Sequence, residues 1–132
     1  MKITADTNVL VRAIVGDDAR QSGIAQAVLA EAESVVITLP TLCELVWVLG
    51  RGYKIAADDV AEAVRRLIES VNVVVNRAAA EAGLALLAAG GDFADGVIAF
   101  EGRWLGGEVF VSFDQTAIRL LEQQGEAVRG LK

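Results

Sequence analysis

Short apolar runs rich in valine and isoleucine alternate along this chain with longer segments whose apolar residues recur at helical spacing. Runs of this kind are typical of strands that are covered on both faces, as in a parallel sheet. Strands that alternate with helices join into βαβ units and give the α/β fold class. The predicted strands are 2–5, 35–38, 71–75 and 109–113, with a further edge strand at 127–131.

The segments between the strands carry the start and stop signals of helices. Pro40 opens one helix, because proline suits the first helical position, and glycine pairs such as Gly90–Gly91 close others. The predicted helices are 7–15, 19–33, 40 to the glycines at 50–52, 57–70, 78–89, 92–105 and 115–124. No linker or repeat interrupts this order. We therefore expect one domain over residues 1–132, a three-layer α/β/α sandwich with a central parallel sheet of about four or five strands.

The charge and the residue types restrict the function. The chain has a net charge of −6, so it lacks the basic surface that attracts nucleic acid in general, and an RNA ligand would need local cations, metal ions or a partner. There is no histidine and a single cysteine, which excludes the usual zinc sites, the commonest general base and an internal disulfide. With no signal peptide and no long apolar run, we expect a cytoplasmic protein without a membrane span.

Four acids, Asp6, Glu44, Asp95 and Asp114, are each the only charge in an apolar segment. Burying an ionised carboxylate without a partner is very costly, so acids in such segments need cations, hydrogen-bond donors or metal. Asp6 and Asp114 follow predicted strands and belong at the carboxyl edge of the sheet, where sites form. Glu44 and Asp95 lie in opening helical turns that could begin at the same edge. We expect the four acids to converge.

Several carboxylates in one pocket repel one another, and a divalent cation bound through oxygen, Mg²⁺ or Mn²⁺, is a stable solution. Such an ion can activate water and stabilise the leaving oxygen when a phosphodiester is cleaved. This chemistry needs no side-chain base, which suits a chain without histidine. The pattern therefore predicts metal-assisted hydrolysis of a phosphodiester.

Each acid also has a structural interpretation as a turn or cap residue. Asp6 could be a structural turn residue, and Asp92 is a plausible cap of the helix that contains Asp95. Glu44 could complete a capping box with Thr41, and Asp114 could start the last helix together with Ser112 and Gln115. The coincidence of four such acids favours a functional site.

Four short motifs occur in a recognisable order: Ala5–Asn8 after the first strand, Glu44–Leu45 after Pro40, Asp92–Ala99, and Ser112–Asp114. With these motifs the whole chain resembles the PIN-domain ribonucleases, and within them the VapC-like toxins of bacterial toxin–antitoxin modules. Two departures are small: Ser112 stands where the family more often has threonine, and Gly96 follows Asp95 where a helix former is usual.

The resemblance implies an endoribonuclease that depends on Mg²⁺ or Mn²⁺ and cleaves structured RNA such as transfer or ribosomal RNA. It places Asp6, Glu44 and Asp95 as the core acids and Asp114 as a fourth, more variable one. It further implies that Thr7 and Asn8 support Asp6, that Ser112 sits beside the metal site, and that Asp92 is an extra acid at its rim. A homodimer and a cognate antitoxin that blocks the site are implied in the same way.

Basic and aromatic residues are candidates for contacts with RNA or with a partner. Arg12, Arg51, Lys54 and Arg103 could contact phosphates, although ordinary solvated surface is the alternative. Trp47 and Trp104 could stack on bases, but at helical spacing such residues more often belong to a core or an interface. The region 53–70, with Val64 and Leu67, is where we expect antitoxin contact.

Two other functions remain open. Another Mg²⁺-dependent phosphotransfer enzyme, such as an aspartyl phosphatase or a receiver domain, would need a second acid beside Asp6 and a lysine in the later strands, and the chain has neither. A catalytically silent binding module of the same fold would retain the acids only as caps. An inert site, however, has no need to bear the mutual repulsion of four acids.

Overall fold

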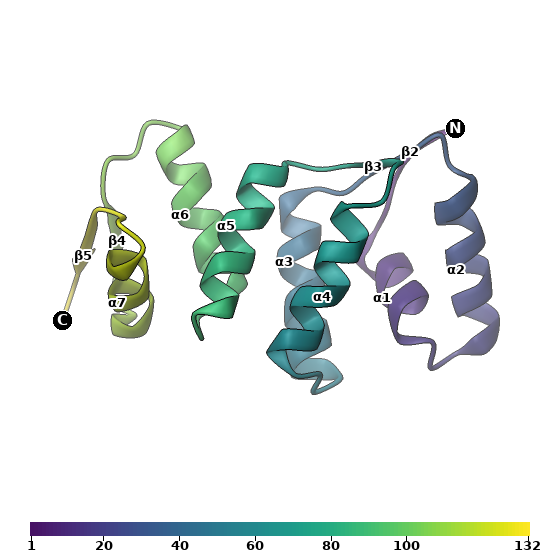
Figure 1. Cartoon of the computed structure of the whole chain (residues 1–132), viewed down its shortest axis with the longest axis horizontal. Helices are drawn as coiled ribbons and strands as arrows, with labels where there is room; N and C mark the ends of the chain where they lie inside the picture. Colours follow the sequence, from purple (N-terminus) through teal and green to yellow (C-terminus); the bar gives the residue numbers. More distant parts are fainter. The chain divides into compact units, whose positions relative to one another are not determined.

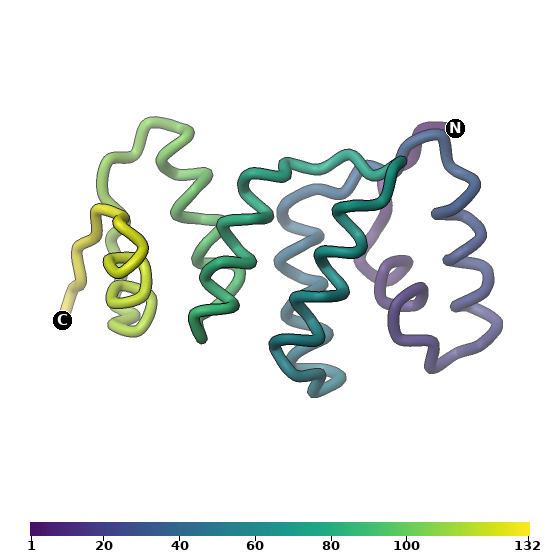
Figure 2. The backbone as a smooth tube through the Cα atoms, viewed as in Figure 1, coloured from purple at the N-terminus to yellow at the C-terminus, as the bar shows by residue number.

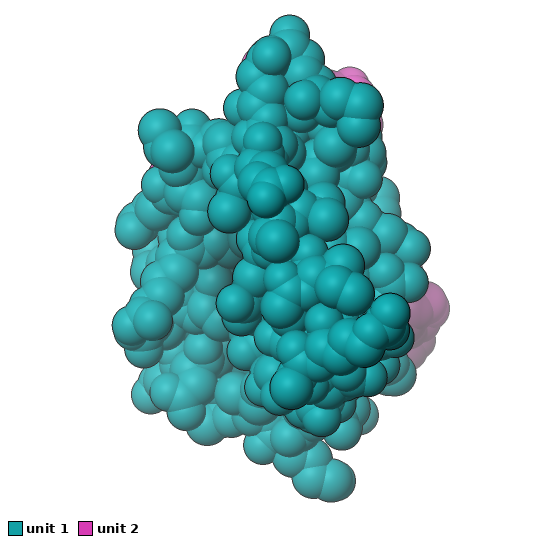
Figure 3. Space-filling view, turned by 90° about the vertical axis from the view of Figure 1, so that its right-hand side faces the viewer, with its two compact units in different colours: residues 1–76 teal, residues 77–132 magenta.

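Short parallel strands and α-helices alternate from the first residues to the last, in the order that the sequence predicts (Figures 1 and 2). The computed structural model describes residues 1–132 and divides them into two compact units, residues 1–76 and residues 77–132 (Figure 3). We call these the N-terminal unit and the C-terminal unit.

The N-terminal unit is built around a parallel sheet of three short strands. The strands are β1 (Lys2–Thr4), β2 (Ser34–Val36) and β3 (Val73–Val74), in the order β1-β2-β3. Val35 in the middle strand lies opposite Ile3 on one side and Val73 on the other. The helices, which lie below the strands in Figure 1, are α1 (Thr7–Val15), α2 (Ala19–Glu31), α3 (Leu39–Trp47), the π-helix η1 (Val48–Gly52) and α4 (Ala57–Ile68).

Aliphatic side chains at helical spacing form the core of this unit. On the α3–η1 segment Leu42, Leu45 and Leu49 are fully buried, because steps of three and four residues place them on one face. On α4 the fully buried residues include Val64 and Ile68. The expectation that Val64 contacts a partner is therefore wrong, since its side chain belongs to the core.

The C-terminal unit pairs two parallel strands with three helices. The elements are α5 (Arg77–Ala88), α6 (Phe93–Trp104), β4 (Phe110–Ser112), α7 (Gln115–Gln123) and β5 (Val128–Gly130). Phe110 and Val128, which are opposite one another in the two strands, pack against the buried side chains of Leu86, Leu120 and Leu121. This apolar cluster holds α7 beside β4 and β5.

Two glycines allow α5 and α6 to pack against each other at close range. A Cβ atom at Gly96 would collide with the backbone carbonyl of Ala82 and would lie 2.9 Å from the Cα of Gly83. A Cβ atom at Gly83 would lie 2.7 Å from the ring of Phe93. Gly96 therefore does more than loosen its helical turn, because its missing side chain lets α5 approach.

All strand pairs are parallel, so the predicted α/β class is confirmed. The strands are shorter than the apolar runs suggested, and hydrogen bonds join them into a sheet of three strands and a sheet of two. No helix has both the length and the apolar composition that crossing a lipid bilayer requires.

Candidate active site

Asp6 stands where β1 gives way to α1. The amide of Ala5 still donates to the carbonyl oxygen of Val36 in β2, at 3.1 Å, and the next residue leaves the sheet. Asp6 then caps α1: its backbone is extended and its Oδ1 accepts a hydrogen bond from the amide of Thr7 at 2.8 Å. The cap fixes the orientation of a solvent-exposed carboxylate at the carboxyl edge of the sheet.

Glu44 lies on α3, which begins at the same edge of the sheet. Thr38 caps this helix by accepting a hydrogen bond from the amide of Thr41 at 3.4 Å, and Pro40 takes the second helical position. The capping box of Thr41 and Glu44 is therefore wrong. The helix begins at Leu39 with Thr38 as its cap, so Thr41 already lies within the first turn. Glu44 is exposed on the outer side of α3, while its neighbours Leu45 and Val46 are buried.

The C-terminal unit brings three acids together. Asp92 caps α6 by accepting from the amide of Ala94 at 3.1 Å, and Asp95 lies in the first turn of that helix. Asp114 caps α7 by accepting from the amides of residues 116 and 117, at 3.0 and 3.1 Å. Ser112 Oγ accepts from the amide of Asp114 at 2.9 Å and so steadies this cap.

The pKa of Asp95 reflects its burial and the charges of the neighbouring acids. Its side chain is half-buried, and desolvation raises its pKa above the ordinary value. The negative charges of Asp92 and Asp114 raise the pKa of Asp95 further. Asp92 and Asp114 are therefore near enough to Asp95 for their charges to act on it within the C-terminal unit.

The predicted burial of the four acids is wrong for three of them. Asp6, Glu44 and Asp114 are exposed to solvent, and only Asp95 is half-buried. Ala5 beside Asp6 and Leu45 beside Glu44 are buried, whereas Phe113 beside Asp114 is exposed; the acids occupy helix starts and an outer helix face. Each unit carries two of the four acids, and no three acidic or cysteine side chains lie close enough together to hold a metal ion by themselves.

A family model described as the PIN domain matches residues 3–121 and extends over both units. The chain belongs to the PIN-domain family. Proteins of this family are typically metal-dependent nucleases that act on nucleic acids, and its α/β/α fold agrees with the parallel strands and helices described above. None of the curated proteins compared with the sequence is similar enough to count as a match.

The donor atoms of this PIN domain suit a hard divalent cation. The candidate ligands are carboxylates, and a serine hydroxyl lies beside Asp114. The chain offers no histidine and a single cysteine, so softer metals have few ligands here. Desolvation is the largest cause of the raised pKa of Asp95, and a bound cation would relieve the repulsion from Asp92 and Asp114 that adds to it.

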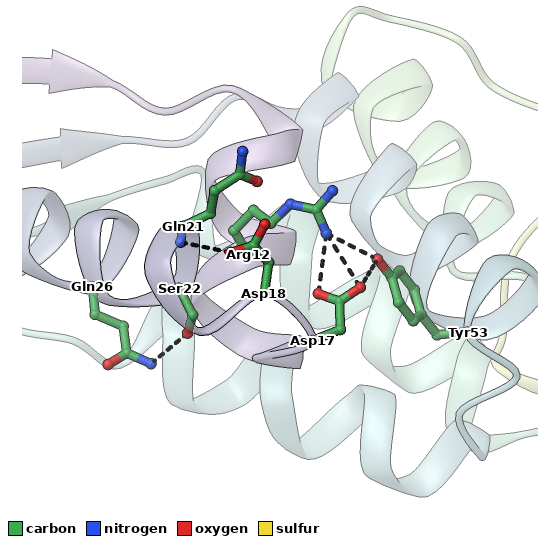
Figure 4. A network of polar contacts seen from close by, with 7 residues as sticks. All are labelled: Arg12, Asp17, Asp18, Gln21, Ser22, Gln26 and Tyr53. Atoms are coloured by element: carbon green, nitrogen blue, oxygen red, sulfur yellow. Dashed lines mark hydrogen bonds and ion pairs between the residues drawn. The ribbon is translucent and has the colours of Figure 1, made fainter.

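Two of the four cations predicted to contact phosphate are already paired with acids. Arg12 donates to Asp17 at 3.0 Å and to the hydroxyl of Tyr53 at 3.3 Å, and that hydroxyl donates to Asp17 at 3.1 Å (Figure 4). Arg103 forms an ion pair with Glu126 at 2.5 Å. Arg51 and Lys54 form no ion pair.

The polar network of Arg12, Asp17 and Tyr53 was not predicted from the sequence. Partial desolvation would raise the pKa of Asp17, but the hydrogen bond from Tyr53 and the charge of Arg12 outweigh it and leave the pKa below its usual value. Tyr53 stands 36 residues after Asp17, so no local spacing could have connected them.

Proposed function

We propose that this PIN domain is an endoribonuclease that depends on Mg²⁺ or Mn²⁺ and cleaves structured RNA of the transfer or ribosomal class. The observation that carries the proposal is the acidic group around Asp95, in a chain whose family consists mainly of metal-dependent nucleases. These carboxylates lie at the starts of α6 and α7, and a divalent cation bound near Asp95 would relieve the repulsion between them.

In this proposal Asp6, Glu44, Asp95 and Asp114 hold the metal ion, and Asp92 lies at the rim. A bound divalent cation would supply the Lewis acidity that activates water and offsets the charge of the cleaved phosphodiester. The amide of Thr7 holds Asp6 in place, and two helical amides hold Asp114. These fixed carboxylates need no reorganisation when they receive a cation, which favours binding.

The test is cleavage of a pool of structured RNAs by the purified chain with Mg²⁺ or Mn²⁺. The variants Asp6→Asn, Glu44→Gln and Asp95→Asn should each lose at least about 100-fold in rate, as expected when one part of a metal site is removed. EDTA should abolish cleavage. The matched control is Glu31→Gln, an exposed acid on α2, which should cleave at the wild-type rate.

Cleavage that survives EDTA, or that is equal in wild type and Asp95→Asn, contradicts the proposal. An inactive wild type that still binds Mn²⁺ would favour a different phosphotransfer reaction or a silent binding module. Phosphoester substrates would then be tested.

The finer biological role is that of a cytoplasmic VapC-like toxin, a homodimer held inactive by a cognate antitoxin. The resemblance of the motifs supports this role, and so does a surface hollow of about 360 Å³ in the N-terminal unit. Ile14, Ala63 and Leu67 give the hollow an apolar lining, and Asp59, Glu62 and Arg66 complete it. An apolar segment of the antitoxin fits such a lining.

Leu67→Glu tests this role, because it places a charge in the hollow at a side chain that is only half-buried. We expect the variant to keep its nuclease activity and to lose at least about tenfold in affinity for a co-expressed antitoxin. The control is Asp58→Asn on the same helix, an exposed acid that does not line the hollow. Equal affinity of Leu67→Glu and wild type would exclude the hollow as the contact surface.

A further inference from the structure

Trp47, the last residue of α3, is largely exposed to solvent, although the apolar residues next to it in the sequence are buried. Its exposed fraction is 63%, while Leu45, Val46 and Leu49 are at most 8% exposed and complete the core without it. Leaving an indole in water forfeits a large hydrophobic gain. Of the two structural roles predicted for Trp47, core or interface, its exposure excludes the core, and the ring is open to a ligand or a partner.

The segment that follows Trp47 is positively charged, although the chain is acidic as a whole and Glu44 precedes the indole by three residues. Residues 45–57 contain Arg51 and Lys54 and no acid, against a net charge of −6 for the whole chain. Arg51 follows Trp47 by four residues, which places it about one helical turn further along η1. Neither cation forms an ion pair, so both charges are available to an anion.

The turn that carries the two cations is held in a defined conformation. The amides of Tyr53 and Ile55 donate to the carbonyl oxygens of Val48 and Leu49, each at 3.1 Å. Lys54 between them has a φ of 57°, in the left-handed region. The hydroxyl of Tyr53 is fixed by Arg12 and Asp17 (Figure 4). Single-turn π-helical segments are frequent at functional sites.

Trp47 is also close to the proposed active site along α3. It follows Glu44 by three residues, so the two side chains lie on one face and are separated by about 4.5 Å along the helix axis. A ligand bound at Glu44 that continues along this face therefore meets the indole first and Arg51 next.

Trp104 makes a useful comparison, because it is more exposed but has different surroundings. Its exposed fraction is 77%. Its neighbour Arg103 is engaged, with Glu126 at 2.5 Å and with the ring of Phe100 at 5.9 Å. Exposure of an indole alone does not make a binding site for an anion, and only Trp47 combines exposure with unpaired cations.

We propose that Trp47, Arg51 and Lys54 form a subsite for an unpaired RNA nucleotide that flanks the cleaved bond. The indole stacks on the base, and the two cations contact the adjoining phosphates. Stacking is tolerant of sequence, so this subsite selects unpaired nucleotides and not a particular base. The inference rests on the proposed endoribonuclease function for its substrate class. The positive charge favours RNA over an apolar protein segment as the occupant.

A binding experiment can separate this subsite from the cleavage step. The full chain carries Asp6→Asn to prevent cleavage and Trp104→Phe to leave Trp47 as the only tryptophan. Titration with a single-stranded oligoadenylate of about eight nucleotides, a length within the range that stacking sites bind, should quench the fluorescence of Trp47. The matched variant that keeps Trp104 and carries Trp47→Phe should show no quenching.

The affinity for the oligonucleotide should follow the stacking surface and the cations. Trp47→Ala should weaken binding by about 5- to 100-fold, Trp47→Phe by less, and Trp104→Ala not at all. Arg51→Gln should lower the slope of log K against log salt by about 0.7, the value for one phosphate contact with a single strand. In cleavage assays Trp47→Ala should raise KM and leave kcat nearly unchanged.

Each outcome decides the subsite separately from the nuclease activity. If wild type cleaves RNA and Trp47→Ala binds and cleaves equally well, the subsite is excluded while the proposed function stands. If wild type cleaves no RNA, quenching of Trp47 by the oligonucleotide still supports the subsite, and its absence excludes it. If Trp47→Ala only dissociates a dimer, as seen by light scattering, the indole belongs to an interface between copies and the inference is overturned.

Discussion

Asp95 is a carboxylate whose ionised form is disfavoured in the folded chain. Its pKa is raised by desolvation and by Asp92 and Asp114, so its ionised form destabilises the fold. The unfolded value is about 3.9. The penalty is therefore present above the raised folded pKa and disappears as the pH falls below the unfolded value. A carboxylate held in this way is suited to receive a cation.

The neutral variant Asp95→Asn should therefore be more stable than wild type at pH 7 in EDTA, because it lacks the repulsion. The difference in Tm should shrink as the pH falls toward about 4, where the wild-type carboxyl takes up its proton. This difference in Tm is measured by thermal unfolding at pH 7 and at about pH 4, monitored by circular dichroism. Asp58→Asn, an exposed acid on α4, serves as the control. A gain in Tm that does not depend on pH would contradict this explanation.

At the scale of elements, the contact between α5 and α6 depends on the glycines that let the two helices approach. Gly96→Ala would place a Cβ against the backbone of Ala82, which cannot move aside as a flexible side chain can. Overpacking of this kind costs about 1–3 kcal/mol. Gly102 lies on the same helix with nothing within 4 Å of its missing Cβ. Gly102→Ala should instead stabilise by about 0.5–1 kcal/mol.

Urea unfolding of the two variants beside wild type measures these opposite effects. The midpoint should fall for Gly96→Ala and rise for Gly102→Ala. Equal shifts in one direction would mean that helix propensity alone decides both positions, and that the close approach of α5 does not restrict Gly96.

Most helix and strand positions follow from the sequence because their signals are local. The helix predicted at 7–15 is observed as Thr7–Val15, and the predicted edge strand at 127–131 is observed as Val128–Gly130. The cap of α6 by Asp92 was also readable, since an Asp three residues before another acid is a common helix start. Spacing along the chain is sufficient for such features.

The remaining features depend on residues that are distant in sequence. The contact of Gly96 with Ala82 and the network of Arg12, Asp17 and Tyr53 join separate elements, and no local pattern indicates them. The exposure of Glu44 was missed because its apolar neighbours occupy the opposite side of the helix. For Asp6, Glu44, Asp95 and Asp114 the motifs predict the residues, and their joint action stays a prediction.

At the scale of the whole molecule, the open question of domain organisation can be decided by cooperativity. The sequence predicts one domain over residues 1–132, the family match extends over both units, and each unit has buried apolar side chains of its own. A single domain unfolds in one transition whose calorimetric and van't Hoff enthalpies agree. Two independent units would give two transitions. We expect one transition, because units of this size bury a smaller share of their surface than a larger domain does and are only marginally stable alone.

Gly96→Ala makes this test decisive, because its collision lies wholly within the C-terminal unit. In one cooperative domain the substitution lowers the single transition by several degrees and leaves it undivided, at about 2–8 °C per kcal/mol for domains of roughly this size. Differential scanning calorimetry of wild type and variant shows the outcome. A variant trace that splits, with one part still at the wild-type temperature, would show that residues 1–76 fold without the rest and that the single-domain prediction is wrong.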